Sequence, residues 1–332
     1  MKNTNLIIGK KGIGKTSVMF DEIKKLIENE ENLLIIDNKE EYYKTYGEEL
    51  NNKGYKINVI NFKDSTKSNG FNPLYMPYKL YKSGNKDTAI RIIDNFSKSL
   101  MHKQEVMDPF WTDSAASYLT GLIILLFKEA KEEEINLASI QVMISQIEKD
   151  LTKVREYVNN LDLISPEYTY LSTTINAPNE TRGGIVSVLK MELTKYISTE
   201  NLLNLLCTNE IDLTKDEKNA IFVIGNEDYN KLTNVVISEV INSNIKYSYI
   251  LDNFDSLDKI LGLGDLLETN NKVYIVSRNK ENITDKYGKY ILDKFDNIEN
   301  IEEEKKLIVG NYNVYPTIDK QDKKYFNLNG IL

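Results

Sequence analysis

The sequence predicts an α/β protein whose mainly parallel sheet is interrupted by an inserted all-α domain. Short apolar runs alternate with amphipathic stretches through residues 5–60, and this β-α-β-α-β order is typical of a parallel sheet. From about residue 81 to residue 208, the apolar side chains recur at helical spacing instead. Strand-like runs then return. We therefore expect one core built from residues 1–78 and 213–332, and an all-α domain at residues 79–212.

The first strand and the first helix flank a glycine-rich loop. Residues 5–8 read as a short buried strand, and residues 17–27 place apolar side chains at helical spacing. Between them, Gly9-Lys10-Lys11-Gly12-Ile13-Gly14-Lys15-Thr16 fits the G-x-x-x-x-G-K-[ST] phosphate-binding loop (P-loop). An accidental match in a Gly- and Lys-rich turn is the alternative, and the ordered strand, motif and helix argue against it.

The chemistry of such a loop gives each part of the motif a role. Its glycines let the backbone approach a phosphate closely, and its N–H groups and the helix N-terminus supply positive potential. We expect Lys15 to reach the β- and γ-phosphates and the Thr16 hydroxyl to hold Mg²⁺. The sequence therefore predicts a nucleoside triphosphate site. The expected nucleotide-binding residues are Gly9, Gly12, Ile13, Gly14, Lys15, Thr16 and Ser17.

Two further strands complete the first half of the predicted sheet. Residues 33–37 form a strand that ends in the carboxylate Asp37, at the edge where ligands gather in open α/β sheets. Residues 39–52 form a polar helix, which Gly54 stops. Residues 56–60 form the third strand.

The insertion reads as a set of helices around an apolar core. Helical spacing covers residues 90–100, 109–130, 137–148, 151–160 and 185–196. We expect Trp111, Tyr118 and Phe127 in the packing core of these helices and not on a base-stacking platform. The longest apolar run, residues 118–127, is too short to cross a bilayer, so it predicts a buried helix and no direct membrane span.

Strands return in the second half of the core. The expected elements are strands at 220–224, 247–252 and 272–276, and helices at 231–244 and 257–267. The acidic run at residues 297–304 predicts a solvated face. Residues 307–309 and 313–315 predict edge strands.

The composition disfavours several classes of function. A net charge of −8 argues against a uniformly basic nucleic-acid-binding body, although it permits a local basic channel. His102 is the only histidine, which disfavours a histidine-built metal site or a Ser-His-Asp triad. The single Cys207 cannot form an internal disulfide and lies in an apolar run, so it predicts a buried structural thiol in a reducing cytoplasm.

A P-loop enzyme needs a second carboxylate beside the metal ion, and Asp252 is the candidate because it ends an apolar strand. Motor ATPases place a Glu directly after this Asp as the general base, and here that residue is Asn253. An amide can position a water but cannot accept its proton, so Asn253 puts fast hydrolysis in doubt. Asp255 follows two residues later, and the sequence alone leaves open whether it reaches that water.

Several further motifs stand in a specific order along the chain. They are Ile36-Asp37-Asn38-Lys39-Glu40, Gly54-Tyr55-Lys56-Ile57-Asn58-Val59-Ile60, Ser68-Asn69-Gly70-Phe71-Asn72-Pro73-Leu74, Asp108-Pro109-Phe110-Trp111, Thr181-Arg182-Gly183-Gly184-Ile185, Tyr249-Ile250-Leu251-Asp252-Asn253-Phe254 and Tyr287-Gly288. With the P-loop, this ordered set resembles the type IV secretion coupling proteins across nearly the full length. These are the TraG-like and TraD-like conjugation ATPases, relatives of the FtsK/HerA translocases.

The resemblance implies a RecA-like ATPase core with an inserted all-α domain, and ATP and Mg²⁺ as cofactors. It also implies a homo-oligomer, in the family usually a hexamer around DNA. Members move relaxase-bound single-stranded DNA towards a type IV secretion channel, and the inserted domain recognises the DNA-processing complex. The family's N-terminal transmembrane anchor is absent from this sequence. We therefore expect a cytoplasmic protein that meets the inner face of the membrane through a membrane-anchored partner.

Two departures from the family pattern keep a second function open. Asn253 stands in place of the family's Glu, and Arg278 stands where the resemblance places a γ-phosphate-sensing glutamine. The sequence therefore predicts an ATP-dependent DNA-transfer motor with Asp252, Asn253 and Arg278 in its catalytic site. The alternative is a degenerate nucleotide-binding adaptor that acts beside an active motor without hydrolysing ATP, so ATPase activity is left open between the two.

Two arginines are candidates for a finger that reaches the γ-phosphate of a neighbouring subunit. Arg182 and Arg278 are two of only four arginines in the chain, and such a group can accelerate phosphoryl transfer strongly. A surface ion pair is the alternative for Arg182.

A P-loop kinase or GTPase unrelated to DNA is a third reading of the whole chain. The nearest guanine-reading pattern, Asn38-Lys39-Glu40-Glu41, comes too early and ends in Glu.

Overall fold

A computed structural model describes residues 3–101, 108–302, 308–318, 322–328 and 331, so His102 lies outside the described residues. The chain divides into two compact units. The first comprises Met1–Asn69 and Leu213–Ile318 and contains the sheet. The second comprises Gly70–Asp212 and Asp319–Leu332 and is mainly helical.

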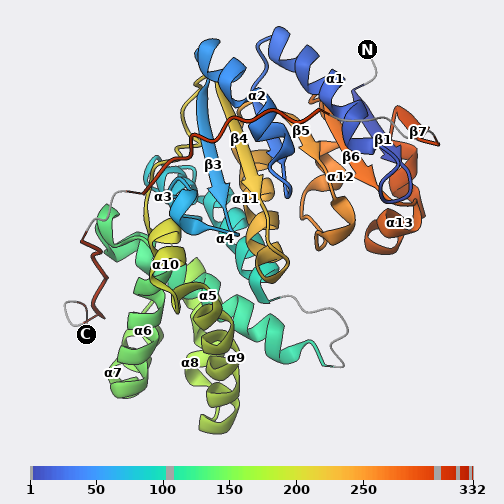
Figure 1. The fold of residues 1–332 in the computed structure, drawn as a ribbon. Coiled ribbons are helices and arrows are strands. Elements are labelled where there is room, and N and C mark those ends of the chain that lie inside the picture. Colours follow the sequence, from blue (N-terminus) through green and yellow to red (C-terminus); the bar gives the residue numbers. More distant parts are fainter. Residues whose placement is uncertain (1–2, 102–107, 303–307, 319–321, 329–330, 332) are drawn as a thin grey trace. The chain divides into compact units, whose positions relative to one another are not determined.

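The first unit contains a seven-stranded sheet in which every neighbouring pair of strands is parallel. The strands are β1 (Thr4–Ile8), β2 (Leu33–Ile36), β3 (Lys56–Asn61), β4 (Asn219–Ile224), β5 (Ser248–Leu251), β6 (Val273–Ser277) and β7 (Asn297–Asn300). Their order is β3-β4-β2-β5-β6-β1-β7 (Figure 1). The predicted fold class, a parallel α/β core interrupted by helices, is confirmed.

Helices cover both faces of this sheet. α1 (Lys15–Glu28) and α2 (Glu41–Asn52) share one apolar core with alternate strand residues, among them Phe222 and Ile250. α11 (Asn230–Asn242) packs on the opposite face, where the Tyr249 hydroxyl donates to the Val240 carbonyl at 3.4 Å. Because successive strand residues point to opposite faces, strands buried on both faces are apolar throughout.

Three predictions for the end of the first unit need correction. Of the predicted helix 257–267, only Leu263–Leu266 (α12) is α-helical. Gly262, directly before it, has a left-handed φ of 84°, so the helix cannot begin earlier. The acidic run is partly solvated as predicted, with Glu299 and Asn300 exposed, but Asn297–Asn300 also pairs with β1 as the edge strand β7, which was not predicted. Residues 308–318 form no strand, so the edge strand at 313–315 is wrong, and Leu307 lies outside the described residues.

Residues 308–318, which we call the C-terminal strap, lie along α2 instead of joining the sheet (Figure 1). The Tyr312 N–H donates to the Lys44 carbonyl at 3.0 Å. The Gly310 N–H donates to the Thr45 hydroxyl at 2.9 Å. The backbone of the strap therefore finds its hydrogen-bond partners on a helix. The remaining elements of this unit are α13 (Glu281–Tyr287) and 3-10 turns at Ser65–Lys67, Glu227–Tyr229, Phe254–Ser256 and Lys289–Lys294.

The second unit is built around α5. Its helices are α3 (Tyr75–Lys82), α4 (Lys86–Met101), α5 (Phe110–Glu129), α6 (Leu137–Lys149), α7 (Leu151–Asn159), α8 (Pro166–Asn176), α9 (Asn179–Ile197) and α10 (Glu200–Cys207), with a 3-10 turn at Glu132–Glu134. By length and composition α5 could cross a membrane, but 72% of its apolar 18-residue window is buried within the protein. It packs against α4, α8 and α9 as a core helix does.

Three of these helices, α3, α8 and α10, were not predicted from the spacing of apolar residues. Among the aromatic residues expected in the core, Tyr118 and Phe127 are fully buried. Trp111 is 38% exposed, so its prediction is wrong: it lies in the first turn of α5, with its ring against Gly184. Cys207 is half-buried, and burial raises the pKa of its thiol to about 12, so the reactive thiolate is scarce.

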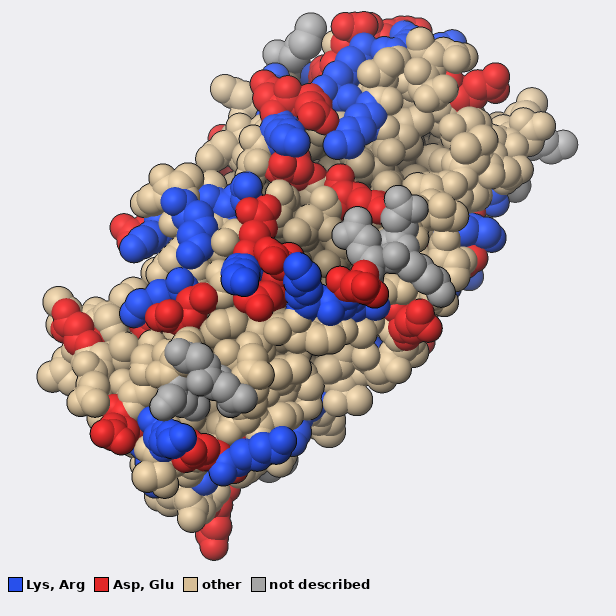
Figure 2. Space-filling model, turned by 90° about the vertical axis from the view of Figure 1, so that its left-hand side faces the viewer, with Lys and Arg blue, Asp and Glu red and all other residues tan. Residues whose placement is uncertain are grey.

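Charges of both signs are mixed over the surface. On the face in Figure 2, lysine and arginine side chains alternate with aspartate and glutamate side chains. Several of the ion pairs in the protein join neighbours on one helix, such as Lys25 with Glu22 at 2.7 Å and Lys98 with Asp94 at 2.6 Å. Such exposed pairs contribute little to stability, and the mixture accords with a modest net charge of −8.

Candidate nucleotide-binding site

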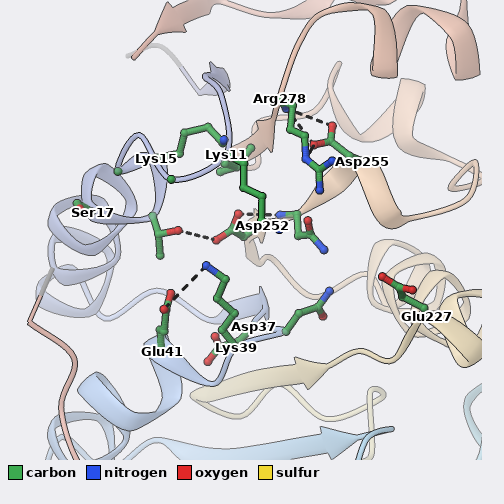
Figure 3. Close-up of a pocket in the computed structure, with 16 residues that line it drawn as sticks. Lys11, Lys15, Ser17, Asp37, Lys39, Glu41, Glu227, Asp252, Asp255 and Arg278 are labelled. Carbon is green, nitrogen blue, oxygen red and sulfur yellow. Dashed lines mark hydrogen bonds and ion pairs between the residues drawn. The ribbon is translucent and has the colours of Figure 1, made fainter. Parts of the chain in front are cut away.

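A pocket of about 430 Å³ opens at the carboxyl edge of the sheet in the first unit. Its walls come from the P-loop after β1, from residues 37–41 after β2, from residues 252–255 after β5, and from Arg278 after β6. In Figure 3, Lys11 and Lys15 lie on one side of Asp252, and Lys39 and Glu41 lie on the other. The pocket thus forms where parallel α/β sheets bind ligands.

The P-loop adopts a conformation that depends on its glycines. Gly12 and Gly14 both have a φ of 87°, a left-handed conformation that other residues rarely adopt, and Gly14 begins α1. The Lys15 ammonium donates to the carbonyls of Gly9 and, at 2.9 Å, Lys10. Burial lowers the pKa of Lys15. The loop therefore holds its lysine folded back over its own carbonyl groups.

The expected nucleotide-binding residues occupy two kinds of position in this loop. Those that line the pocket are Gly12, Gly14, Lys15, Thr16 and Ser17. Gly9 and Ile13 pack behind them. A Cβ on Gly9 would lie only 2.8 Å from the Ile13 side chain, so the loop closes tightly there.

The two expected metal ligands lie together. The Thr16 hydroxyl donates to Asp252 Oδ2 at 3.5 Å, although 236 residues separate the two in sequence. Burial raises the pKa of the Asp252 carboxyl above its usual value, and the hydrogen bond from Tyr42 offsets part of this rise. A hydroxyl and a carboxylate are oxygen donors of the kind that Mg²⁺ prefers. The chemistry of these two residues fits a magnesium ion.

Asp37, which ends the second predicted strand, has a structural role at this edge. It is buried, and its carboxylate accepts the Tyr43 N–H at 2.8 Å, close to the start of α2. Burial raises the pKa of Asp37 to about 7. Beside it, Lys39 lies 4.0 Å from Glu41. Asp37 thus fixes the start of α2 at the pocket.

Asn253 takes a left-handed backbone conformation, with a φ of 56°, directly after the strand. Its N–H donates to Asp252 Oδ1 at 2.7 Å, and its side-chain amide donates to the Ser256 hydroxyl at 2.8 Å. The residue lines the pocket and is held on both its backbone and its side chain. Its amide offers no proton acceptor comparable to a carboxylate.

Asp255 is saturated with hydrogen bonds and holds the end of β6. Its carboxylate accepts the Ser277 hydroxyl at 2.5 Å, the Arg278 N–H at 3.0 Å and the Asn282 side-chain amide at 2.7 Å. The Arg278 guanidinium lies 3.4 Å from the same carboxylate. Asp255 therefore anchors Arg278 at the pocket and is poorly placed to take a proton from water.

Arg182 lies in the helical unit and does not line this pocket. On α9, its guanidinium donates to the Ala177 carbonyl at 3.4 Å and to the Asn179 side chain at 2.9 Å.

Tyr42 is a residue of the site that sequence reasoning missed. Its hydroxyl donates to Asp252 Oδ2 at 2.7 Å, and in sequence it is only one apolar-face residue of α2.

Comparisons with known proteins give one family and one fold. The family described as type IV secretory system conjugative DNA transfer matches residues 5–259. The bacterial conjugative coupling protein TrwBdeltaN70, in complex with sulphate, has a TM-score of 0.62 at 11% identity over 90% of this chain and 70% of that chain. The plasmid coupling protein TrwB in complex with ADP and Mg²⁺ has a TM-score of 0.61 at 12% identity, over 89% and 69%. No curated protein sequence matches. At such identity the structural likeness shows the RecA-like fold alone.

Proposed function

Because the chain belongs to the type IV secretory system conjugative DNA transfer family, we propose that it is an ATP-driven coupling protein for conjugative DNA. The observation that carries the proposal is the meeting of Thr16 and Asp252 across the P-loop pocket. This is the arrangement that a Mg²⁺–nucleotide complex requires. The ADP and Mg²⁺ bound to the structurally similar TrwB support the same ligands in this chain.

Each residue of the pocket has a defined task in this proposal. Lys15 leaves the carbonyls of Gly9 and Lys10 and pairs with the β- and γ-phosphates. Thr16 and Asp252 hold the metal ion, which when bound neutralises the charge that develops on the transferred phosphate. Arg278, anchored by Asp255, adds positive charge beside the γ-phosphate.

Asn253 and Asp255 support a second candidate function, that of a nucleotide-binding adaptor beside an active motor. Asn253 lacks the proton acceptor of a general base, and the Asp255 carboxylate is occupied by its hydrogen-bond donors. A protein with this pocket can bind ATP and release it unhydrolysed. In that case nucleotide binding, and not hydrolysis, would control how the adaptor acts on the motor.

The proposed partners follow from the family. They are single-stranded DNA with its relaxase complex, further copies of this chain in a homo-oligomer such as a hexamer, and a membrane-anchored partner or the secretion channel. The mixed surface charge in Figure 2 favours local phosphate contacts over a uniformly basic body. We propose a cytoplasmic location at the inner face of the membrane, reached through those partners.

The test is steady-state ATP turnover of the purified protein, with and without single-stranded DNA, beside a Lys15→Ala control. We expect DNA-stimulated turnover that the control abolishes. Tight ATP binding without turnover in either condition would establish the adaptor instead. If Lys15→Ala leaves nucleotide affinity unchanged, the assignment of the pocket fails.

A further inference from the structure

Tyr42 on α2 is buried behind the nucleotide pocket, where its hydroxyl contacts Asp252, a residue that lines the pocket. The hydroxyl donates to Asp252 Oδ2 at 2.7 Å, the same oxygen that the Thr16 hydroxyl faces at 3.5 Å. Tyr42 and Asp252 are 210 positions apart in sequence. A hydrogen bond to a carboxylate is stronger and shorter than one between neutral groups, so this contact constrains Asp252 more than a packing contact could.

The Tyr42 ring is held firmly from the other side. It is 1% exposed, and its centroid lies 5.1 Å from that of Phe20 on α1, the helix that follows the P-loop. The start of α2 is fixed in turn by Asp37, which accepts the Tyr43 N–H. A buried ring between two helices has little rotational freedom. Its hydroxyl is therefore set at one place relative to the P-loop.

The Asp252 carboxylate is pinned at both of its oxygens. Oδ1 accepts the Asn253 N–H at 2.7 Å, and Oδ2 accepts the Tyr42 hydroxyl. Two donors from different elements fix the plane of the carboxylate. A carboxylate in a fixed plane presents its remaining lone pairs in fixed directions, and one of these lies toward Thr16.

We propose that Tyr42 is a positioning residue of the magnesium site, which orients Asp252 so that its carboxylate and the Thr16 hydroxyl hold the metal ion and its water shell together. The proposal rests on the proposed function, since it assumes that the pocket binds a Mg²⁺–nucleotide complex. It assigns α2 a part in the site beyond shaping its wall. Outer hydrogen bonds of this kind orient metal-binding groups and affect their metal affinity.

Tyr46 offers a matched control on the same helix. It lies one turn further along α2, and its ring also packs against Phe20, at 5.6 Å. Its hydroxyl donates to the Phe20 carbonyl at 2.6 Å, within the apolar core. Tyr46→Phe therefore removes a buried hydroxyl from the same environment without touching Asp252.

The experiment measures ADP affinity by calorimetry for the full chain, once with Mg²⁺ and once with EDTA. We expect Tyr42→Phe to weaken ADP binding about tenfold in Mg²⁺, equivalent to about 1.4 kcal/mol, and to leave binding in EDTA unchanged. Tyr46→Phe should bind ADP as the parent protein does in both conditions. In an Asp252→Asn background, Tyr42→Phe should cause no further loss, because Tyr42 acts through Asp252.

The outcomes separate this inference from the proposed function. If the parent protein binds no ADP, or binds it equally with Mg²⁺ and with EDTA, the proposed function fails and the inference with it. If the parent protein depends on Mg²⁺ but Tyr42→Phe matches it, the inference alone is overturned. If Tyr42→Phe lowers ADP affinity equally in Mg²⁺ and in EDTA, or no more than Tyr46→Phe does, the inference is overturned because Tyr42 would act only in packing. A further loss of ADP affinity in the Asp252→Asn background would also overturn it, because Tyr42 would then act apart from Asp252.

Discussion

The Arg278 guanidinium lies 3.4 Å from the carboxylate of Asp255, which also accepts the backbone N–H of Arg278 at 3.0 Å. The Asp255 side chain is 11% exposed and that of Arg278 is 55% exposed. Asp255 is thus the buried partner of the pair and Arg278 the exposed one. The carboxylate organises the loop after β6, and the guanidinium is left at the mouth of the pocket.

This asymmetry predicts unequal effects on stability. Asp255→Ala leaves several donors without their acceptor, so we expect it to lower the free energy of unfolding by about 1–3 kcal/mol. Arg278→Ala removes a largely exposed charge and should cost less than about 1 kcal/mol. Urea unfolding of both variants tests this. Equal losses would show that the ion pair, and not the carboxylate, holds the loop.

Asn253→Glu tests whether the pocket lacks only its general base. A base contributes about 100-fold or more to such a reaction, so we expect a gain of that order in ATP turnover. Because residue 253 has a φ of 56°, the variant should also lose about 1 kcal/mol of stability. Asn253→Gln is the control, with the same side-chain length as Glu and no base. Equal turnover in the two variants would favour the adaptor.

Asp37 predicts a pH dependence of stability. Its pKa is about 7 in the folded chain, against a usual value of 3.8, so the folded state keeps a proton that the unfolded state has lost. Its contribution to stability is complete below the lower value and is lost as pH rises through about 7, by at most about 1.4 kcal/mol per pH unit. Asp37→Asn cannot ionise, and it still accepts the Tyr43 N–H.

We therefore expect Asp37→Asn to gain stability relative to the parent protein between about pH 5 and about pH 8. Urea unfolding without nucleotide at several pH values within that range measures it. Parallel curves for the two proteins would contradict the raised pKa of Asp37.

Gly310 allows the strap to lie against α2. A Cβ at this position would lie 2.4 Å from the Lys44 carbonyl oxygen and 2.7 Å from the Thr45 Cα. Because both are backbone atoms, Gly310→Ala should displace the strap and lower stability by about 1–3 kcal/mol. Faster proteolysis within residues 308–318 would report the displacement. Gly183→Ala, where nothing lies within 4 Å, is the control and should not destabilise.

The sequence predicts that the P-loop and Asp252 lie at strand ends, because both depend on local patterns. A strand, a glycine-rich turn and a helix follow one another within residues 4–28, and Asp252 ends an apolar strand. Parallel pairing then brings such strand ends to one edge. Asn253, adjacent to Asp252, is placed by the same argument.

Features that depend on distant packing could not be predicted in this way. The Tyr42 hydroxyl reaches Asp252 because Phe20 fixes the orientation of its ring, and no spacing within α2 encodes that. Asn297–Asn300 looks like a solvated run because the partner strand β1 lies at the opposite end of the chain. Trp111 is a large aromatic residue of the kind that usually packs in a core, but its position at the start of α5 leaves it partly exposed.

The strand order has a consequence for synthesis on the ribosome. None of the first three strands made, β1, β2 and β3, neighbours another of the three in the sheet. Each pairs with a strand made after residue 218, so three apolar segments emerge without partners while residues 70–212 of the helical unit are translated. Exposed strands of this kind invite aggregation. The helices within residues 70–212 can form before the sheet does, whereas the nucleotide pocket needs every strand end up to Arg278. This delay favours chaperone binding to the nascent N-terminal segment.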